Sequence, residues 1–227
     1  MSTRVDVLSA GSVRRARLAD ARLYLVMEAR QHPADLAQFL DAVLAAGVDI
    51  VQLREKEAEA GDLIRWAHLF KEAADRYGAL FIVNDRPDVA LAVEADGVHL
   101  GQNDVPAAVA RRIIGDEMLI GISTHAEAEY AAVPAEADYL TAGPVHETPT
   151  KPGRPATGTE FIRYAAERAR AALESRPWFA VGGIGPGTLP AVVEAGAVRI
   201  VVVRAITDST DPAAAVRRLI EILPPNP

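Results

Sequence analysis

Charged side chains in this sequence stand directly after short apolar runs. The segment 52–56 (Gln-Leu-Arg-Glu-Lys) follows one run, Asn84 and Asp85 follow the next, and Asp104 and Lys151 come after later ones. Arginine and lysine are the side chains that bind phosphate groups, and carboxylates beside a phosphate are ligands that Mg²⁺ commonly uses. These residue types therefore predict a site for a multiply anionic substrate together with magnesium.

A second group of residues offers neutral hydrogen-bond donors. The stretch 182–187 (Gly-Gly-Ile-Gly-Pro-Gly) follows another apolar run, and glycine-rich loops bind phosphate through backbone N–H groups. The hydroxyls of Thr148 and Thr150 could serve the same anion. The stretch lacks the G-x-G-x-x-G spacing of dinucleotide sites, so nucleotide binding is not expected there. We predict a second phosphate site made of amides and hydroxyls.

Each of these features also has a purely structural reading. The charges of 54–56 could be a solvated loop, and Asp85 or Asp104 could cap the helix that follows it. His99 stands between two apolar residues and is predicted to be a packed strand residue, whereas His146 is a candidate substrate contact. The functional reading depends on the groups meeting at one place.

Composition removes several classes of protein. The chain has 227 residues, of which half are hydrophobic, and its formal net charge is −7. Nucleic-acid binding through bulk positive charge is therefore not expected. The absence of cysteine excludes disulfides, thiolate metal sites and cysteine nucleophiles. With no apolar run of spanning length and no secretory signal, we expect a cytoplasmic protein that does not enter membranes.

The elements that must position these residues alternate between strands and helices. Strands are predicted as apolar runs at 22–27, 48–53, 79–83, 97–100, 118–122, 138–142, 178–181 and 198–203. Helices are predicted from three- and four-residue apolar spacing at 33–46, 62–77, 87–93, 106–114, 126–133, 160–173, 189–194 and 212–220.

Eight strand–helix units in one compact body fit a closed TIM (β/α)₈ barrel of the α/β class, with an open doubly wound sheet as the alternative. The active site of such a barrel lies at the carboxyl ends of the strands, where the polar residues stand. We predict a single barrel domain over 21–222, a mobile extension over 1–20 with one helical turn after Ser12, and a frayed tail over 223–227.

The order of these motifs resembles the thiamine phosphate synthase family over about residues 23–220. Several stretches carry the resemblance: 52–56, 84–86 running through 95–104, 121–125, 143–145, 148–151 and 182–184. The resemblance implies a barrel enzyme that joins a hydroxymethylpyrimidine diphosphate to a thiazole phosphate or its carboxylated form, releasing diphosphate. It also implies a dissociative mechanism, in which the thiazole nitrogen attacks a ring-stabilised cation without needing a protein base.

The resemblance assigns roles residue by residue. It implies that the pyrimidine diphosphate is bound by Gln52, Leu53, Arg54, Glu55, Lys56, Asn84, Ser123 and Lys151. Among these, catalysis is implied for Arg54, Lys56, Ser123 and Lys151. The thiazole phosphate is assigned to Thr148, Pro149, Thr150, Gly182, Gly183, Val203 and Arg204, and Mg²⁺ to Asp85 and Asp104. The sequence departs from the family at Arg204, where a serine is usual, so this phosphate contact is left open.

Three other functions remain as alternatives: a related barrel that isomerises a thiazole phosphate or regulates, a phosphosugar isomerase or epimerase, and a non-catalytic metabolite-binding module. The cations and carboxylates of the first motif favour the synthase, because tautomerisation needs no metal–diphosphate site. An isomerase needs an acid–base pair, and the sequence offers no convincing one. The expected partners are small-molecule substrates, and homo-oligomer formation is left open.

Overall fold

Eight parallel strands close into one barrel. In this computed structural model, which describes residues 9–30, 33–148, 155–172 and 176–225, every strand pairs with the next one along the chain and β8 pairs with β1. The strands are β1 (Leu23–Met27), β2 (Ile50–Leu53), β3 (Leu80–Asn84), β4 (Gly97–Leu100), β5 (Leu119–Thr124), β6 (Tyr139–Ala142), β7 (Trp178–Val181) and β8 (Ile200–Val202). The closed barrel confirms the predicted fold and replaces the open-sheet alternative.

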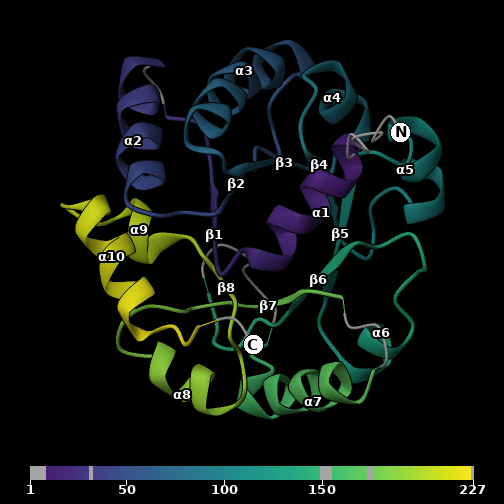
Figure 1. Cartoon of the computed structure of the whole chain (residues 1–227), viewed down its shortest axis with the longest axis vertical. Helices are drawn as coiled ribbons and strands as arrows, with labels where there is room; N and C mark the ends of the chain where they lie inside the picture. Colours follow the sequence, from purple (N-terminus) through teal and green to yellow (C-terminus); the bar gives the residue numbers. More distant parts are fainter. Residues whose placement is uncertain (1–8, 31–32, 149–154, 173–175, 226–227) are drawn as a thin grey trace, which may run out of the picture.

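Helices surround the barrel on its outer face (Figure 1). They are α2 (Pro33–Ala45), α3 (Ala60–Tyr77), α4 (Pro87–Ala92), α5 (Ala107–Ile114), α6 (Glu127–Ala131), α7 (Gly158–Ala171), α8 (Leu189–Glu194), α9 (Arg204–Thr207) and α10 (Pro212–Ile222). None of the helices described is long and apolar enough to cross a lipid bilayer.

Alternation along each strand separates two apolar layers. Side chains pointing outward, such as Leu25 and Leu53, join the layer between the barrel and its helices. Side chains pointing inward fill the barrel, where the rings of Tyr24, Tyr139 and Phe179 pack edge to face with centroids 5.6–6.0 Å apart. This aromatic plug closes the barrel interior, so a ligand can enter only above it.

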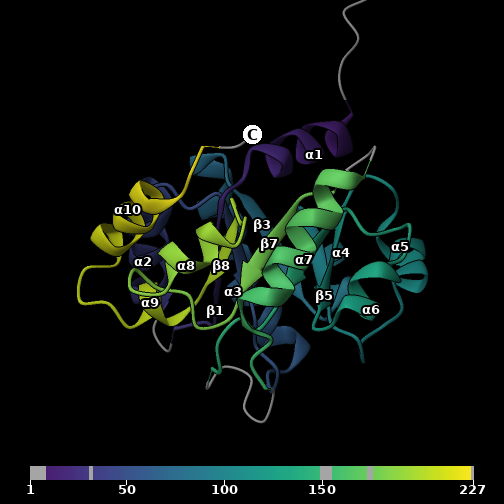
Figure 2. The ribbon, with the colours of Figure 1, turned by 90° about the horizontal axis from the view of Figure 1, so that it is seen from below.

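The amino ends of the strands are covered by α1 (Ala10–Asp20), which lies across that end of the barrel in Figures 1 and 2. The sequence predicted one helical turn in a mobile extension, and for residues 10–20 this is wrong. Ser9 caps the helix, Leu18 packs into the barrel interior, and Arg14 and Arg15 form ion pairs with the barrel. Residues 1–8 lie outside the described part of the chain.

Three aspartates support this closed end. Asp49, Asp96 and Asp138 each stand one residue before an even-numbered strand and accept hydrogen bonds of 2.8–2.9 Å from backbone N–H groups at the start of the preceding strand. Arg14 binds Asp96 at 2.9 Å and Arg15 binds Asp138 at 2.8 Å. The carboxylates therefore join neighbouring strands to each other and α1 to the barrel.

Candidate active site

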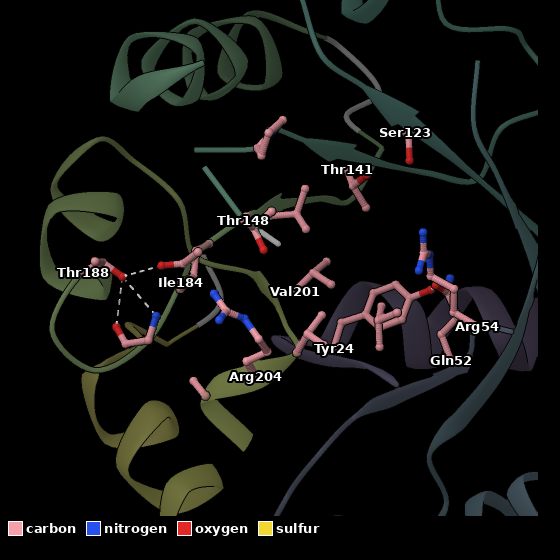
Figure 3. Close-up of a pocket in the computed structure, with 18 of the residues that line it drawn as sticks. Tyr24, Gln52, Arg54, Ser123, Thr141, Thr148, Ile184, Thr188, Val201 and Arg204 are labelled. Atoms are coloured by element: carbon pink, nitrogen blue, oxygen red, sulfur yellow. Dashed lines mark hydrogen bonds between the residues drawn. The ribbon is translucent and has the colours of Figure 1, made fainter. Parts of the chain in front are cut away.

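A cavity of about 320 Å³ opens at the carboxyl ends of the strands, above the aromatic plug. Figure 3 shows its walls: Gln52 and Arg54 lie toward one side, and Thr188, Ile184 and Arg204 lie toward the other. Within the described residues its lining includes two arginines and no carboxylate. In a chain with a net charge of −7, this lining provides a local site for an anion.

The first side of the cavity is built from β2, β3 and β5. Gln52 and Ser123 point inward and are 2% and 3% exposed, whereas Arg54 and Asn84 are half-buried at the ends of their strands. The Ser123 hydroxyl lies 2.9 Å from Nε2 of His99. Arg54 forms no ion pair with any residue that the structure describes, so its charge is available to a ligand.

The second side is the loop after β7. Gly182 and Gly183 have φ values of 109° and 62°, and a side chain at either would overlap the loop after β6. Thr188 holds the loop closed, since its hydroxyl accepts a hydrogen bond from Gly185 N–H and donates one to Gly183 C=O, both 3.0 Å. Glycine is required here because the positive φ and the close approach of Pro144 and His146 leave no place for a side chain.

Thr148, Val203 and Arg204 complete the second side. Arg204 begins the short helix α9, which the sequence analysis did not predict, and it is exposed at the cavity rim. No described carboxylate forms an ion pair with it. The second side thus combines loop amides, a hydroxyl and one guanidinium.

Two carboxylates lie together beside the cavity. The Asp104 carboxyl lies against that of Asp85, and Lys56 Nζ is 3.3 Å from Asp85 Oδ2. Burial raises the pKa of Asp85, and the neighbouring Asp104 carboxyl raises it further, while Lys56 offsets part of the effect. Asp85 also has a φ of 61°, which is uncommon for a residue other than glycine and is found at functional sites. The chain therefore holds Asp85 in a position that its own charge and backbone disfavour.

The structure separates the predicted site residues that it describes into three groups. Gln52, Arg54, Asn84, Ser123, Thr148, Gly182, Gly183, Val203 and Arg204 line the cavity, whereas Lys56, Asp85 and Asp104 form the adjacent acidic cluster. Pro149, Thr150 and Lys151 lie outside the described residues.

Leu53 and Glu55 form the third group and do not line the cavity. Leu53 follows inward-facing Gln52 and therefore points into the outer apolar layer. The Glu55 carboxylate turns away to accept a 2.7 Å hydrogen bond from Ala29 N–H, which joins the loops after β1 and β2. In this arrangement the Leu53 side chain cannot contact a ligand in the cavity.

Sequence reasoning missed several inward residues of the cavity. Tyr24 and Thr141 lie within apolar strands, and His99, predicted to be a packed strand residue, is buried but also reaches the cavity wall. Strand alternation could have found Tyr24 and Thr141, because each stands two positions from another inward side chain, whereas the neighbours of His99 at that spacing are glycines. His146 is half-buried in the loop after β6, and it is not among the lining residues.

A closed parallel barrel with its cavity at the carboxyl ends of the strands is the architecture of the (β/α)₈-barrel enzymes. Residues 23–206 match the model of the thiamine monophosphate synthase family. The chain belongs to this family and is a transferase.

Known relatives agree with this assignment over nearly their full lengths. The chain is 55% identical over 203 residues to a thiamine-phosphate synthase of Acidothermus cellulolyticus, covering 88% of this chain and 94% of the relative. It is 51% identical over 214 residues to a thiamine-phosphate synthase of Mycobacterium bovis, covering 90% and 95%. A solved thiamine phosphate pyrophosphorylase from Pyrococcus furiosus superposes with a TM-score of 0.77 at 30% identity, covering 91% of this chain and 96% of that one.

Proposed function

We propose that this chain condenses 4-amino-2-methyl-5-(diphosphooxymethyl)pyrimidine with 4-methyl-5-(2-phosphoethyl)thiazole to give thiamine phosphate and diphosphate, or with the carboxylated form of that thiazole to give the same products and CO₂. One observation carries the proposal within the family: a single cavity has an anion-binding group at each of two sides. Arg54 lies on one side, and the Gly182–Gly183 loop with Arg204 lies on the other. A reaction between two phosphorylated substrates needs two such groups facing one space.

The pyrimidine diphosphate is proposed to occupy the side formed by β2, β3 and β5. The Gln52 amide is suited to an aminopyrimidine edge, which offers an N–H donor next to a ring-nitrogen acceptor. Arg54, Asn84 and Ser123 can then donate to diphosphate oxygens, together with Lys56 at the rim. Lys151 is proposed to act on the same diphosphate, on the basis of the family resemblance.

The thiazole phosphate is proposed to bind the second side, through the Gly182–Gly183 loop, Thr148 and Arg204, with Thr150 assigned by the resemblance. This arrangement directs the thiazole nitrogen toward the pyrimidine carbon. The C–O bond to diphosphate breaks and its electron pair leaves with the diphosphate. The nitrogen lone pair then forms the C–N bond, so that no protein base has to accept a proton. The chain contributes positioning and charge stabilisation.

The acidic cluster suits a magnesium ion. Asp85 and Asp104 are hard oxygen donors held side by side at a charge cost that a cation would relieve. When bound, the ion supplies neutralisation of the diphosphate charge. Asp85 and Asp104 would hold it, with Lys56 beside them.

The direct test is a reaction mixture of the protein, Mg²⁺ and both phosphorylated substrates. We expect diphosphate and thiamine phosphate to form in equal amounts, measured by chromatography and a phosphate-release assay. Binding of either substrate without diphosphate release would favour the metabolite-binding alternative. Conversion of the thiazole phosphate alone would favour the isomerase alternative. From the proposed function we also infer that the protein acts in the cytoplasm and that its partners are these small-molecule substrates.

Asp85→Asn should separate the metal role from folding. Asparagine tolerates positive φ and carries no charge beside Asp104, so the metal-free variant is expected to melt about 2–4 °C higher, the shift that roughly 1 kcal/mol produces in a chain of this size. The stabilisation of the wild type by Mg²⁺ should be lost in the variant. Asp88→Asn, in the exposed pair with Arg86, is the matched control. An equal Mg²⁺-induced shift in Asp85→Asn and wild type would reject the metal assignment.

Arg204→Ala tests the departure from the family pattern. Because Arg204 lies at the rim of the second side, its loss should raise KM for the thiazole phosphate by about tenfold, the scale of one charge-assisted hydrogen bond. KM for the pyrimidine diphosphate should stay near the wild-type value. Steady-state kinetics with each substrate varied in turn distinguish the two constants. An unchanged thiazole KM would mean that this guanidinium does not contact the substrate.

A further inference from the structure

A continuous chain of hydrogen bonds crosses the barrel just below the cavity. Gln52 Nε2 donates to the Tyr24 hydroxyl at 2.7 Å, and that hydroxyl lies 3.0 Å from the hydroxyl of Tyr139. Nδ1 of His99 lies 3.3 Å from the Tyr139 hydroxyl, and Nε2 of His99 lies 2.9 Å from Ser123 Oγ. The two ends of this hydrogen-bond series, Gln52 and Ser123, are the side chains proposed above to contact the pyrimidine substrate.

The two tyrosines in the middle of this hydrogen-bond series are not accessible to water. Tyr24 and Tyr139 are fully buried, and burial raises the pKa of both hydroxyls, so each keeps its single proton at neutral pH. Tyr139 can reach the barrel axis only because its cross-strand neighbour is Gly121, where any side chain would overlap the tyrosine ring. The glycine in β5 therefore provides the space that the Tyr139 ring and its hydroxyl occupy.

The number of protons on each group determines which group donates in each hydrogen bond of this series. Tyr24 accepts from Gln52, so its own proton must go to Tyr139. Within the part of the chain that the structure describes, the remaining hydrogen-bond partner of the Tyr139 hydroxyl is His99 Nδ1, which therefore receives the Tyr139 proton. With Nδ1 as acceptor, neutral His99 carries its proton on Nε2 and donates it to Ser123 Oγ. The Ser123 proton is then left to point at a substrate acceptor, and Gln52 keeps its carbonyl oxygen and one N–H for the substrate.

We propose that Tyr24 and Tyr139 are positioning residues, which fix the Nε2–H tautomer of His99 and thereby present Ser123 as a donor and Gln52 as a paired donor and acceptor to the pyrimidine substrate. The inference rests on the proposed function for the identity of that substrate. In the reverse direction Ser123 would donate its proton to His99 and would face the ligand with oxygen lone pairs only. Lone pairs repel an anionic ligand, which is the kind of ligand that the two arginines of the cavity lining favour.

The direction can be measured on the free protein, without substrate. In ¹⁵N-histidine-labelled protein, the His99 resonances, assigned by comparison with His99→Asn, should show an unprotonated Nδ1 and a protonated Nε2. In Tyr139→Phe the donor to Nδ1 is gone, and we expect a mixture of both tautomers. In Tyr24→Phe, Tyr139 still donates to His99, so the tautomer should be unchanged. A wild-type signal from Nδ1–H or from a doubly protonated ring would overturn the proposal.

Kinetics test the consequence for the reaction. We expect Tyr139→Phe to lower kcat/KM for the pyrimidine diphosphate by about tenfold, the scale of one net hydrogen bond. Tyr24→Phe releases the Gln52 amide and should raise KM for the same substrate about as much. Tyr130→Phe, which removes a hydroxyl that contacts Ala165 C=O in the helical layer, is the matched control and should behave as wild type. Wild-type kinetics in both Tyr24→Phe and Tyr139→Phe would overturn the positioning role.

The two readouts also keep this inference separate from the proposed function. A wild-type protein with the Nε2–H tautomer but no thiamine phosphate formation would reject the function, and the hydrogen-bond direction would stand. If Tyr139→Phe fails to fold, Tyr24→Phe still carries the test. Its expected result is an unchanged His99 tautomer with a raised KM for the pyrimidine diphosphate, and an unchanged KM would contradict the proposal.

Discussion

Replacing Arg54 by alanine is expected to lower kcat by about 10²- to 10³-fold, the range seen when one preorganised electrostatic stabiliser is removed. Arg54 is half-buried in the cavity wall, and no residue of the described chain neutralises it through an ion pair. The proposed reaction moves negative charge onto the leaving diphosphate as the C–O bond breaks. A fixed guanidinium beside that oxygen is therefore worth more in the transition state than in the bound substrate.

Two further variants sharpen this test. Arg54→Lys keeps the charge but loses the planar pair of donors, so its kcat should fall between the wild type and Arg54→Ala. Arg65→Ala removes an arginine that is 72% exposed and paired with Asp62 on the outer face of α3, and it should leave kcat unchanged. Steady-state diphosphate release at saturating substrates measures all three. An Arg54→Ala enzyme with nearly wild-type kcat would exclude Arg54 from charge stabilisation in the reaction.

The barrel could be predicted because each strand is an apolar run followed by a chain reversal. The run 79–83 predicts β3 to within one residue, and α3 ends at Tyr77, as predicted, before Gly78 with a φ of 71°. Helix α1 was not predicted because its stability does not come from local sequence. Arg14 and Arg15 bind Asp96 and Asp138, which are 82 and 123 residues away along the chain. A helix held by such distant partners leaves no local pattern beyond its cap.

The site residues could be predicted where a polar residue ends a strand. The direction of the other side chains depends on the geometry of the barrel. Arg54 and Asn84 were found because a polar residue directly after an apolar run is visible in the sequence. Leu53 was included because it stands within the same motif, although alternation turns its side chain outward. Tyr24 and Tyr139 were missed because an inward tyrosine in an apolar strand looks like any core aromatic residue. Its partners become visible only when the strands are paired.

The closed end of the barrel leads to the largest expected effect on stability. Asp138→Ala should lower the free energy of unfolding by about 3–5 kcal/mol, the scale of removing one partner from a buried ion pair. The Asp138 side chain is 10% exposed, and it accepts from Ile120 N–H and from Arg111, which is 15% exposed, both at 2.8 Å. Arg15 adds less, because its side chain is 44% exposed to solvent.

The loss is large because alanine removes the carboxylate that Ile120 N–H and Arg111 share. The strand N–H loses its side-chain acceptor, and the guanidinium keeps only backbone carbonyls as acceptors, with no negative charge beside it. A buried strand N–H and a largely buried guanidinium would each keep their desolvation cost and lose the interaction that offsets it. Asp75→Ala removes a carboxylate that is 55% exposed and paired with Lys71 on a helix surface, so it should cost no more than about 0.5 kcal/mol. Urea unfolding followed by circular dichroism compares the two variants. A similar small loss in both would mean that Asp138 does not hold β5, α5 and α1 together, and that the closed end depends on its other contacts, among them Arg14 with Asp96 and the packing of Leu18.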